Sequence, residues 1–291
     1  MLIGWMPPYH GDVRPGGPVP ASRVSWDIAA PSRPGRLTGV KLAGFSDRAN
    51  DLVEVQVVPH PAVMVVFDLG DTPIVIDDGS GQQQRGSVVA GLAPSGARGR
   101  GGRDFECLQV RLSPLVAHAV LGASSELGGT VVALDDLWGR DAVRTQEQLR
   151  AARSWNDRFA IAELALARHH DARRTVDPEV ALAWGQMVAS RGRVRVERLA
   201  AEIGWSRRRL WSRFRSQIGL TPKRTAQLIR FDHAAHRLAA GQSAALVAAE
   251  SGYVDQSHLH RDVMTFAGVT PAAVATEPSL VVDDVAWAAR D

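Results

Sequence analysis

Apolar positions recur every three to four residues over the last third of the chain, and this spacing predicts amphipathic helices. Between residues 196 and 222 the apolar positions stop at Gly204, resume after Ser206 and stop again at Gly219. Glycine adopts positive φ freely at the end of a helix, and serine is a favoured N-cap residue. The pattern therefore predicts two short helices joined by a tight turn, which is a helix-turn-helix unit.

The same plan occurs a second time between residues 244 and 271. A short helix containing Leu246 and Val247 is followed by a turn at Gly252, and Asp255 is placed to cap the next helix. The inward stripe of that helix is formed by Leu259, Val263 and Phe266. We therefore expect two helix-turn-helix units.

One longer amphipathic helix is predicted between the two units, over residues 222–241, with Thr221 as its cap. At about 1.5 Å per residue it spans roughly 30 Å. Because one turn of B-DNA is about 34 Å long, two helices held this far apart fit successive major grooves on one side of a duplex.

The part of the chain before residue 175 has a different pattern, with short apolar stretches rich in β-branched residues and separated by turn-forming residues. Its strands are predicted at 62–69, 72–77, 86–92 and 105–112, and they suggest a small antiparallel barrel. Helices are predicted at 142–152 and 156–170, and together with the segments 113–122 and 134–139 they are expected to cover the barrel. The first 40 residues hold seven of the 16 prolines and are expected to form loops and short edge pieces.

The glycine- and arginine-rich stretch 96–105 lies just before the last predicted strand. Its Arg98, Arg100 and Arg103 could bind an anion, but the glycines favour a flexible hairpin tip, which is the interpretation we adopt.

Length and composition indicate the number of domains and the compartment in which the protein is expected. A chain of 291 residues exceeds the usual single domain, so two domains are expected. The longest apolar runs, such as 62–67, are too short to cross a bilayer, and the N-terminus lacks the features of an export signal. We expect a cytoplasmic protein without a membrane span.

The net charge of +3 conceals a strongly basic region. Residues 191–240 contain 13 Lys or Arg and three acidic residues, so this region carries +10 and the rest of the chain −7. Such a segregated basic region is typical of a surface that binds a polyanion, because contacts to phosphates release condensed counterions. A solvated helix surface is the alternative, and the spacing of the residues decides between them.

The second helix of the first unit separates two kinds of residue. Leu210 and Phe214 lie on one face and are predicted to pack inward. The opposite face carries Arg208, Trp211, Ser212 and Arg215. Arginines on an exposed helix face suit a DNA major groove, where they can donate two hydrogen bonds to guanine.

Residues from about 178 to 276 resemble the DNA-binding domain of AraC/XylS-family transcription regulators. The resemblance rests on "GWSRRRLWSRFRSQIGLTP" and "AAESGYVDQSHLHRDVMTFAGVTP". It implies that bases are read by Arg208, Trp211, Ser212, Gln256, Ser257 and Arg261. Phosphate contacts are expected from Arg207, Arg215, Lys223, Arg224 and His260. Position 259 is Leu and 263 is Val where the family usually has aromatic residues, so the second unit is expected to pack less tightly or to bind DNA more weakly.

The second unit also offers less charge. Arg261 is the lone basic residue between 255 and 267 apart from histidines, and Asp255 and Asp262 are expected to cancel it. We therefore expect the first unit to carry more of the affinity.

The resemblance implies an α+β chain with a cupin-like β-barrel or sandwich and covering helices at 1–175. An all-α domain at 176–276 would hold the two units joined by a long helix, and 277–291 would be a C-terminal tail. The implied partners are double-stranded promoter DNA, RNA polymerase, a small-molecule effector bound in the N-terminal domain and a second copy of the chain.

Candidates for other chemistry are few. Cys107 is predicted to be a core thiol, because no His or Lys that would lower its pKa lies nearby in the sequence. His10 and His60 lack the spacing of a cupin metal site, so no metal, cofactor or catalytic residue is expected. A pocket between the sheets could be lined by Trp5, Trp26 and Phe67.

A DNA-binding regulator without enzyme activity is the interpretation that follows. Two alternatives stay open, a DNA-binding domain fused to an enzyme and one fused to a protein-interaction module. An enzyme that uses a cysteine would need an activated thiol, and an interaction module would not require the +10 region.

Overall fold

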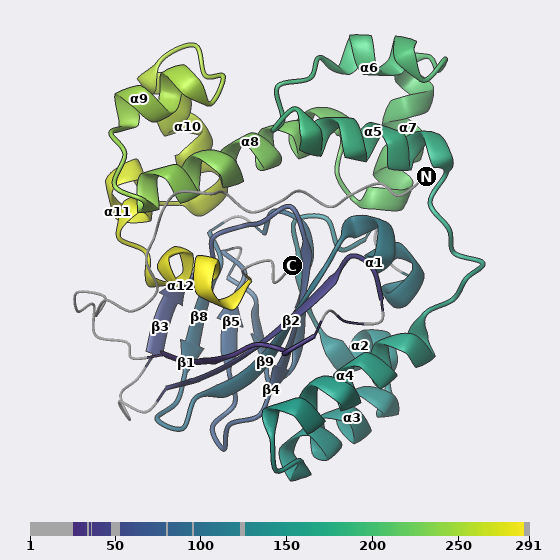
Figure 1. The fold of residues 1–291 in the computed structure, drawn as a ribbon, viewed down its shortest axis with the longest axis vertical. Coiled ribbons are helices and arrows are strands. Elements are labelled where there is room, and N and C mark those ends of the chain that lie inside the picture. The colour runs from purple at the N-terminus through teal and green to yellow at the C-terminus, as the bar shows by residue number, and fades with distance from the viewer. Residues whose placement is uncertain are drawn as a thin grey trace.

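The computed structural model describes residues 26–33, 35, 37–47, 53–79, 81–94, 96–122 and 126–287, without the side chains of Trp26, Val53, Val281, Val282 and Asp284. Within these residues, a β-rich N-terminal part (26–175) lies against a helical part (176–287), as Figure 1 shows. The loops and edge pieces expected before residue 26, with Trp5 and His10, lie outside the described residues.

Two antiparallel sheets form the N-terminal part, with strand orders β1-β2-β9-β4-β7-β10 and β3-β8-β5-β6. Their strands are β1 (Trp26–Ala29), β2 (Val40–Asp47), β3 (Val53–Gln56), β4 (Val63–Asp68), β5 (Val75–Asp77), β6 (Gln83–Arg85), β7 (Val88–Ala90), β8 (Arg98–Gly101), β9 (Glu106–Leu112) and β10 (Val131–Ala133). All four strands predicted from the sequence are present, as β4, β5, β7 and β9. The α+β fold class is confirmed.

Strand β8 corrects the prediction of a flexible hairpin tip at 96–105. It pairs with β3 on one side and β5 on the other, so its backbone groups are satisfied as in an inner strand. Gly99 and Gly101 face the interior, whereas Arg98 and Arg100 are exposed. A Cβ on Gly101 would overlap the ring of Phe105, and one on Gly99 would lie 3.3 Å from Ile76 Cδ1. The glycines are therefore required by close packing rather than by a turn.

The two helices predicted in the N-terminal part are present, and the segments 113–122 and 134–139 that were expected to cover the barrel are helical as well. They are α1 (Pro114–Leu121), α2 (Leu134–Trp138), α3 (Arg140–Ala151) and α4 (Trp155–His169). Helix α4 packs on α1 and α3. Its Phe159 and Leu166 belong to the same hydrophobic cluster as the inner residues of β2, β4 and β9.

The helical part contains both units and the helix between them. Its helices are α5 (Pro178–Ala189), α6 (Val196–Glu202), α7 (Arg207–Ile218), α8 (Pro222–Ala239), α9 (Ala244–Glu250), α10 (Gln256–Ala267), α11 (Pro271–Ala275) and α12 (Pro278–Ala286). The predicted caps are confirmed, because the side chains of Ser206, Thr221 and Asp255 accept hydrogen bonds from the first turns of α7, α8 and α10. Gly219 ends α7 in the left-handed region, with φ 92°.

The stretch 277–291, expected to be a tail, contains α12. This helix returns to the N-terminal part and contacts β1, β3 and α8 (Figure 1). Trp287, just after it, is buried in a small cluster with Phe45, Phe105 and Cys107. A second, larger cluster runs without a break from the N-terminal sheet into both helix-turn-helix units. None of the described helices is long and apolar enough to cross a membrane.

Replacing Gly101 by alanine tests the packing of β8. Because the new methyl group overlaps the buried Phe105 ring, we expect a loss of about 1–3 kcal/mol in the free energy of unfolding. Urea denaturation followed by circular dichroism measures it. The exposed neighbour Arg100→Ala should change the same quantity by less than about 0.5 kcal/mol, and equal losses would contradict the inward placement of Gly101.

Candidate nucleic-acid interface

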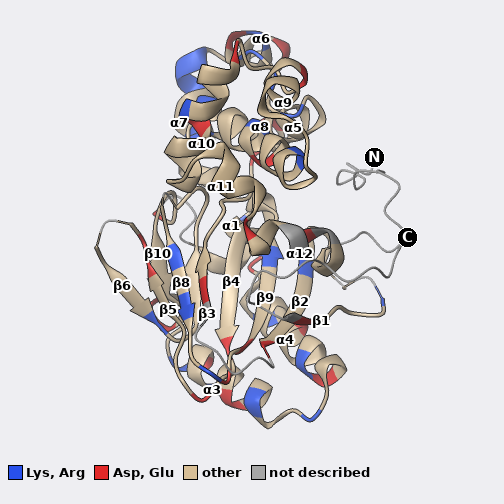
Figure 2. Ribbon diagram, turned by 90° about the vertical axis from the view of Figure 1, so that its left-hand side faces the viewer, with Lys and Arg blue, Asp and Glu red and all other residues tan. Residues whose placement is uncertain are grey.

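Helix α7 presents a basic and aromatic face to solvent. Leu210 and Phe214 are fully buried, which fixes the rotation of the helix about its axis. The residues expected to read bases from this unit, Arg208, Trp211 and Ser212, are all exposed. Figure 2 shows Lys and Arg residues gathered on α7, beyond the end of the N-terminal sheets. The predicted orientation of this helix is confirmed.

The arginines of α7 are not equally available. Arg213 makes two hydrogen bonds to Asp177, which precedes α5, with Nε–Oδ2 2.7 Å and Nη2–Oδ1 2.8 Å. These bonds lower the pKa of Asp177 below its usual value. Arg213 therefore joins two helices of the helical part, a role that its place in a run of arginines does not indicate.

Two further arginines stack on tryptophans. The guanidinium of Arg209 lies 4.4 Å from the ring centre of Trp205, and that of Arg215 lies 5.3 Å from the ring centre of Trp211. Arg207 is 3.8 Å from Glu197, a loose and exposed pair. Within the described residues the Arg208 side chain has no ion pair or hydrogen bond, so it is the most available cation of the helix.

The outer face of α10 carries the second set of predicted residues. Gln256, Ser257, His260 and Arg261 are exposed. Leu259 and Val263 are fully buried, so these aliphatic residues fill the positions at which looser packing was expected.

Asp262 changes the charge expected for α10. Its side chain is buried and lies 2.9 Å from Arg230 of α8, whose guanidinium also stacks on the Tyr253 ring at 4.6 Å. Asp262 therefore neutralises a residue of α8 instead of Arg261. Asp255 is occupied as the cap of α10 through a 2.7 Å bond from the His258 backbone N–H.

Helix α8 contributes two candidates for phosphate contact. Lys223 is exposed, and the described residues include no partner for its side chain. Arg224 is half-buried, with its guanidinium 3.8 Å from the ring centre of Phe266, and burial lowers its pKa. Arg224 is therefore the less available of the two.

Comparison with known families identifies this pair of units. A family model described as a helix-turn-helix domain, of the AraC type, matches residues 199–277, which span the end of α6 through α11 and so include both recognition helices. The segment 199–277 is thus a helix-turn-helix domain of the AraC type. Among curated proteins no match was found.

Comparison with solved structures gives distant matches. ToxT from Vibrio cholerae O395 matches with 12% identity and a TM-score of 0.46, over 82% of this chain and 99% of ToxT. The AraC-like transcriptional activator CuxR matches with 16% identity and a TM-score of 0.24, over 80% of this chain and 90% of CuxR.

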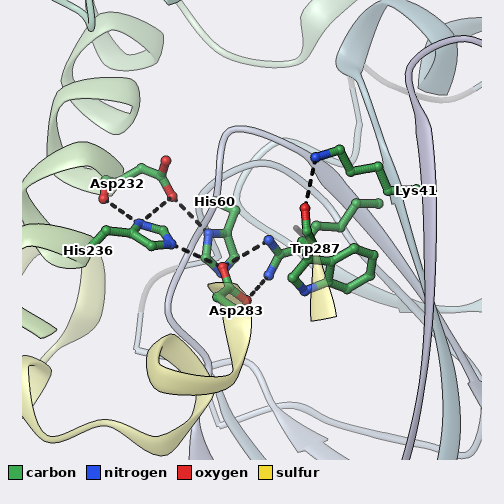
Figure 3. A network of polar contacts seen from close by, with 7 residues as sticks. Lys41, His60, Asp232, His236, Asp283 and Trp287 are labelled. Atoms are coloured by element: carbon green, nitrogen blue, oxygen red, sulfur yellow. Dashed lines mark hydrogen bonds and ion pairs between the residues drawn. The ribbon is translucent and has the colours of Figure 1, made fainter. Parts of the chain in front are cut away.

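A buried polar network joins the two parts of the protein (Figure 3). Arg111 of β9 donates to both carboxylate oxygens of Asp283 in α12, at 2.9 and 2.5 Å. His236 Nε2 of α8 lies 3.1 Å from the same carboxylate, and His60 Nδ1 lies 2.8 Å from Asp232 Oδ1 of α8. Sequence reasoning missed this network because its members lie far apart in the sequence, as Arg111 and Asp283 do at 172 residues, and show no common spacing.

Opposite charges shift the pKa values within the network. Burial alone would lower the pKa of His236, but Asp232 and Asp283 beside it raise the pKa to about 10. Burial would raise the pKa of Asp283, but Arg111, His60 and His236 hold it well below its usual range. Arg111 and His236 are therefore cations that face the Asp283 carboxylate.

His60, Asp232 and His236 also offer metal-ligating atoms within 4.8 Å of one another. However, His236 Nδ1 lies 2.8 Å from the Asp232 backbone oxygen, and its Nε2 faces the Asp283 carboxylate. Since both partners are acceptors, both ring nitrogens carry protons. The geometry is thus that of an imidazolium ion in an ion-pair network.

A cavity of about 160 Å³ lies between the two sheets, next to this network. Its lining is mostly apolar and includes Phe45, Met64, Phe105, Gly99, Gly101 and Trp287. Phe67, expected to line a pocket, is instead fully buried in the larger core cluster, because the face of β4 on which it lies packs against the helices. The side chain of Trp26 is not described. Cys107 also borders the cavity, and burial raises its pKa to about 12, so its thiol stays protonated.

Arg213→Ala separates the structural arginine from the available one. Because Arg213 is held by Asp177, we expect its removal to lower the melting temperature and to leave specific DNA affinity within about threefold of the original. Arg208→Ala should leave the melting temperature unchanged and lower the specific DNA affinity. Thermal unfolding and a DNA titration of both variants check this, and a larger loss of affinity from Arg213→Ala would place Arg213 in the interface.

Proposed function

We propose that the protein is an AraC/XylS-family transcription regulator that binds promoter DNA with α7 and α10 in successive major grooves. The observation that carries the proposal is the pair of exposed polar faces on α7 and α10, held by the 18-residue helix α8. At about 1.5 Å per residue α8 is roughly 27 Å long, which suits grooves one helical turn apart.

Within this proposal the exposed residues divide into two roles. Base edges are read by Arg208, Trp211 and Ser212 on α7 and by Gln256, Ser257 and Arg261 on α10. Phosphates are contacted by Arg207, Arg215, Lys223, Arg224 and His260. Arg208 and Lys223 are the best representatives of each role, because both are exposed and neither has a described partner.

The cavity between the sheets is the proposed effector site. Its apolar lining suits a small apolar molecule, and its position beside Asp283 and His60 connects it to α8. RNA polymerase and a second copy of the chain remain expected partners. AraC/XylS-family regulators are generally not enzymes, and the buried Cys107 offers no activated thiol for the fused-enzyme alternative.

Selection of bound sequences from random duplex DNA by the full chain tests the function. We expect two short motifs whose centres lie about one helical turn, roughly 10–10.5 base pairs, apart. Recovery of a pool without any motif, from protein that is folded by circular dichroism, would reject sequence-specific binding.

Arg208→Ala and Lys223→Ala should weaken binding in different ways. Loss of a base contact is expected to cost about 1–3 kcal/mol on the selected site and to relax selectivity at one or two base pairs. Loss of a phosphate contact should weaken selected and random DNA alike and reduce the salt slope by about one. Titrations on both DNAs at several salt concentrations measure this, and equal losses on both DNAs for Arg208→Ala would move Arg208 to the phosphate class.

The first unit should carry more of the affinity than the second. The reason is that α7 holds five arginines and α10 only Arg261, even though Asp262 is turned away from the outer face. We expect Arg208→Ala and Trp211→Ala to weaken promoter binding more than Ser257→Ala and Arg261→Ala, which should leave binding with a shortened footprint. Footprints and affinities of the four variants test this difference between the units. A larger loss of affinity from Arg261→Ala than from Arg208→Ala would contradict it.

A further inference from the structure

The N-terminal part contacts both recognition helices at their last residue. Gly219 ends α7, and its carbonyl oxygen meets Gly128 in the loop between α1 and β10. A Cβ on Gly128 would overlap that oxygen. Gly128 has no positive φ, so its own backbone conformation does not require glycine. The close approach of the Gly219 carbonyl oxygen is what excludes a side chain there.

The end of α10 is placed in a similar way. Gly268 ends this helix in the left-handed region, with φ 72°. A Cβ on Gly268 would lie 3.3 Å from Gly96 Cα, in the loop that leads into β8. Both contacts involve backbone atoms, so at these two points no flexible side chain can absorb a shift of a recognition helix against the N-terminal part.

The middle of α8 is held by the buried network. Asp283 links His236 of α8 to Arg111 of the sheet, and Asp232 of α8 bonds to His60. Asp283 is 6% exposed, and the indole of Trp287 on the same segment lies 4.3 Å from the Arg111 guanidinium. The N-terminal part therefore touches the DNA-binding units at three points, one near the end of each recognition helix and one between them.

We propose that the N-terminal part fixes the separation of the two recognition helices and so selects the spacing between the half-sites, with Gly128 and Asp283 as positioning residues. This inference rests on the proposed binding of DNA by α7 and α10. One added base pair moves a half-site by about 3.4 Å and rotates it by roughly 35° around the duplex. If α7 and α10 are held rigidly, they cannot both reach half-sites at the altered spacing. If α8 alone joined them, bending of α8 would let them reach both half-sites.

The test uses the full chain and DNA that carries the two selected half-sites with spacers changed in steps of one base pair. The measured quantity is the ratio of affinity at the best spacing to affinity one base pair away. For the unaltered protein we expect a ratio of about tenfold or more, comparable to a mismatched base pair. For Gly128→Ala and Asp283→Asn the ratio should fall to about threefold or less, with unchanged base preference inside each half-site.

Matched controls lie on the same segments. Glu126→Ala changes an exposed side chain in the loop of Gly128, and Val285→Ala changes a 62% exposed side chain of α12. Both should keep the original ratio. If Asp283→Asn does not fold, Gly128→Ala and the larger Gly128→Val carry the test, because they leave the buried charges paired.

Each outcome decides the proposal. A reduced ratio in the Gly128 variants but not in the controls supports it. An unchanged ratio in folded Gly128→Val overturns it and assigns the spacing to α8 alone. Specific binding by the unaltered protein without a spacing preference also overturns it, while absence of any specific binding is a failure of the proposed function instead.

Discussion

The carboxylate of Asp283 connects three segments that lie far apart in the sequence. It is buried, and it accepts hydrogen bonds from Arg111 of the sheet and His236 of α8. Burying charges is costly, so such a group is tolerated only when its partners are held in good geometry. Through this one group α12 is joined to the sheet, to the lining of the cavity and to α8.

The cavity depends on residues that lack side chains as much as on those that line it. Gly99 and Gly101 of β8 face the interior where their neighbours face solvent, and their lack of side chains lets Phe105 and Ile76 pack closely against the strand in the cavity lining. Larger residues at these positions would collide with those side chains. The arginines between them keep the outer face polar, so the strand is amphipathic without containing an apolar side chain.

The helix-turn-helix units were predictable because their signals are local. Ser206 and Asp255 cap the helices that follow them, and the inward stripes recur at a spacing that a short window reveals. The network around Asp283 was not predictable, since its members come together only through the tertiary fold. Strand β8 was predicted wrongly for a related reason. Glycines favour a turn when only the local sequence is considered, whereas Gly99 and Gly101 are explained by close packing that appears only in the tertiary fold.

Charge along the sequence likewise describes the interface incompletely. Arg208 and Arg213 look equivalent in a run of arginines, yet Arg213 is held by Asp177, which lies 36 residues away. Asp262 was expected to oppose Arg261 but pairs with Arg230. The basic region is therefore a mixture of residues that hold the helices together and residues left free for a ligand.

The return of α12 to the sheet has a consequence for biosynthesis. Asp283 is made 172 residues after Arg111, which at about 5–20 residues per second is a delay of roughly 10–30 s. During that interval the sheet can form, but Arg111 lacks its partner and the cavity lacks the wall that Trp287 provides. The N-terminal part of the protein is thus translated long before α12, the helix that completes it.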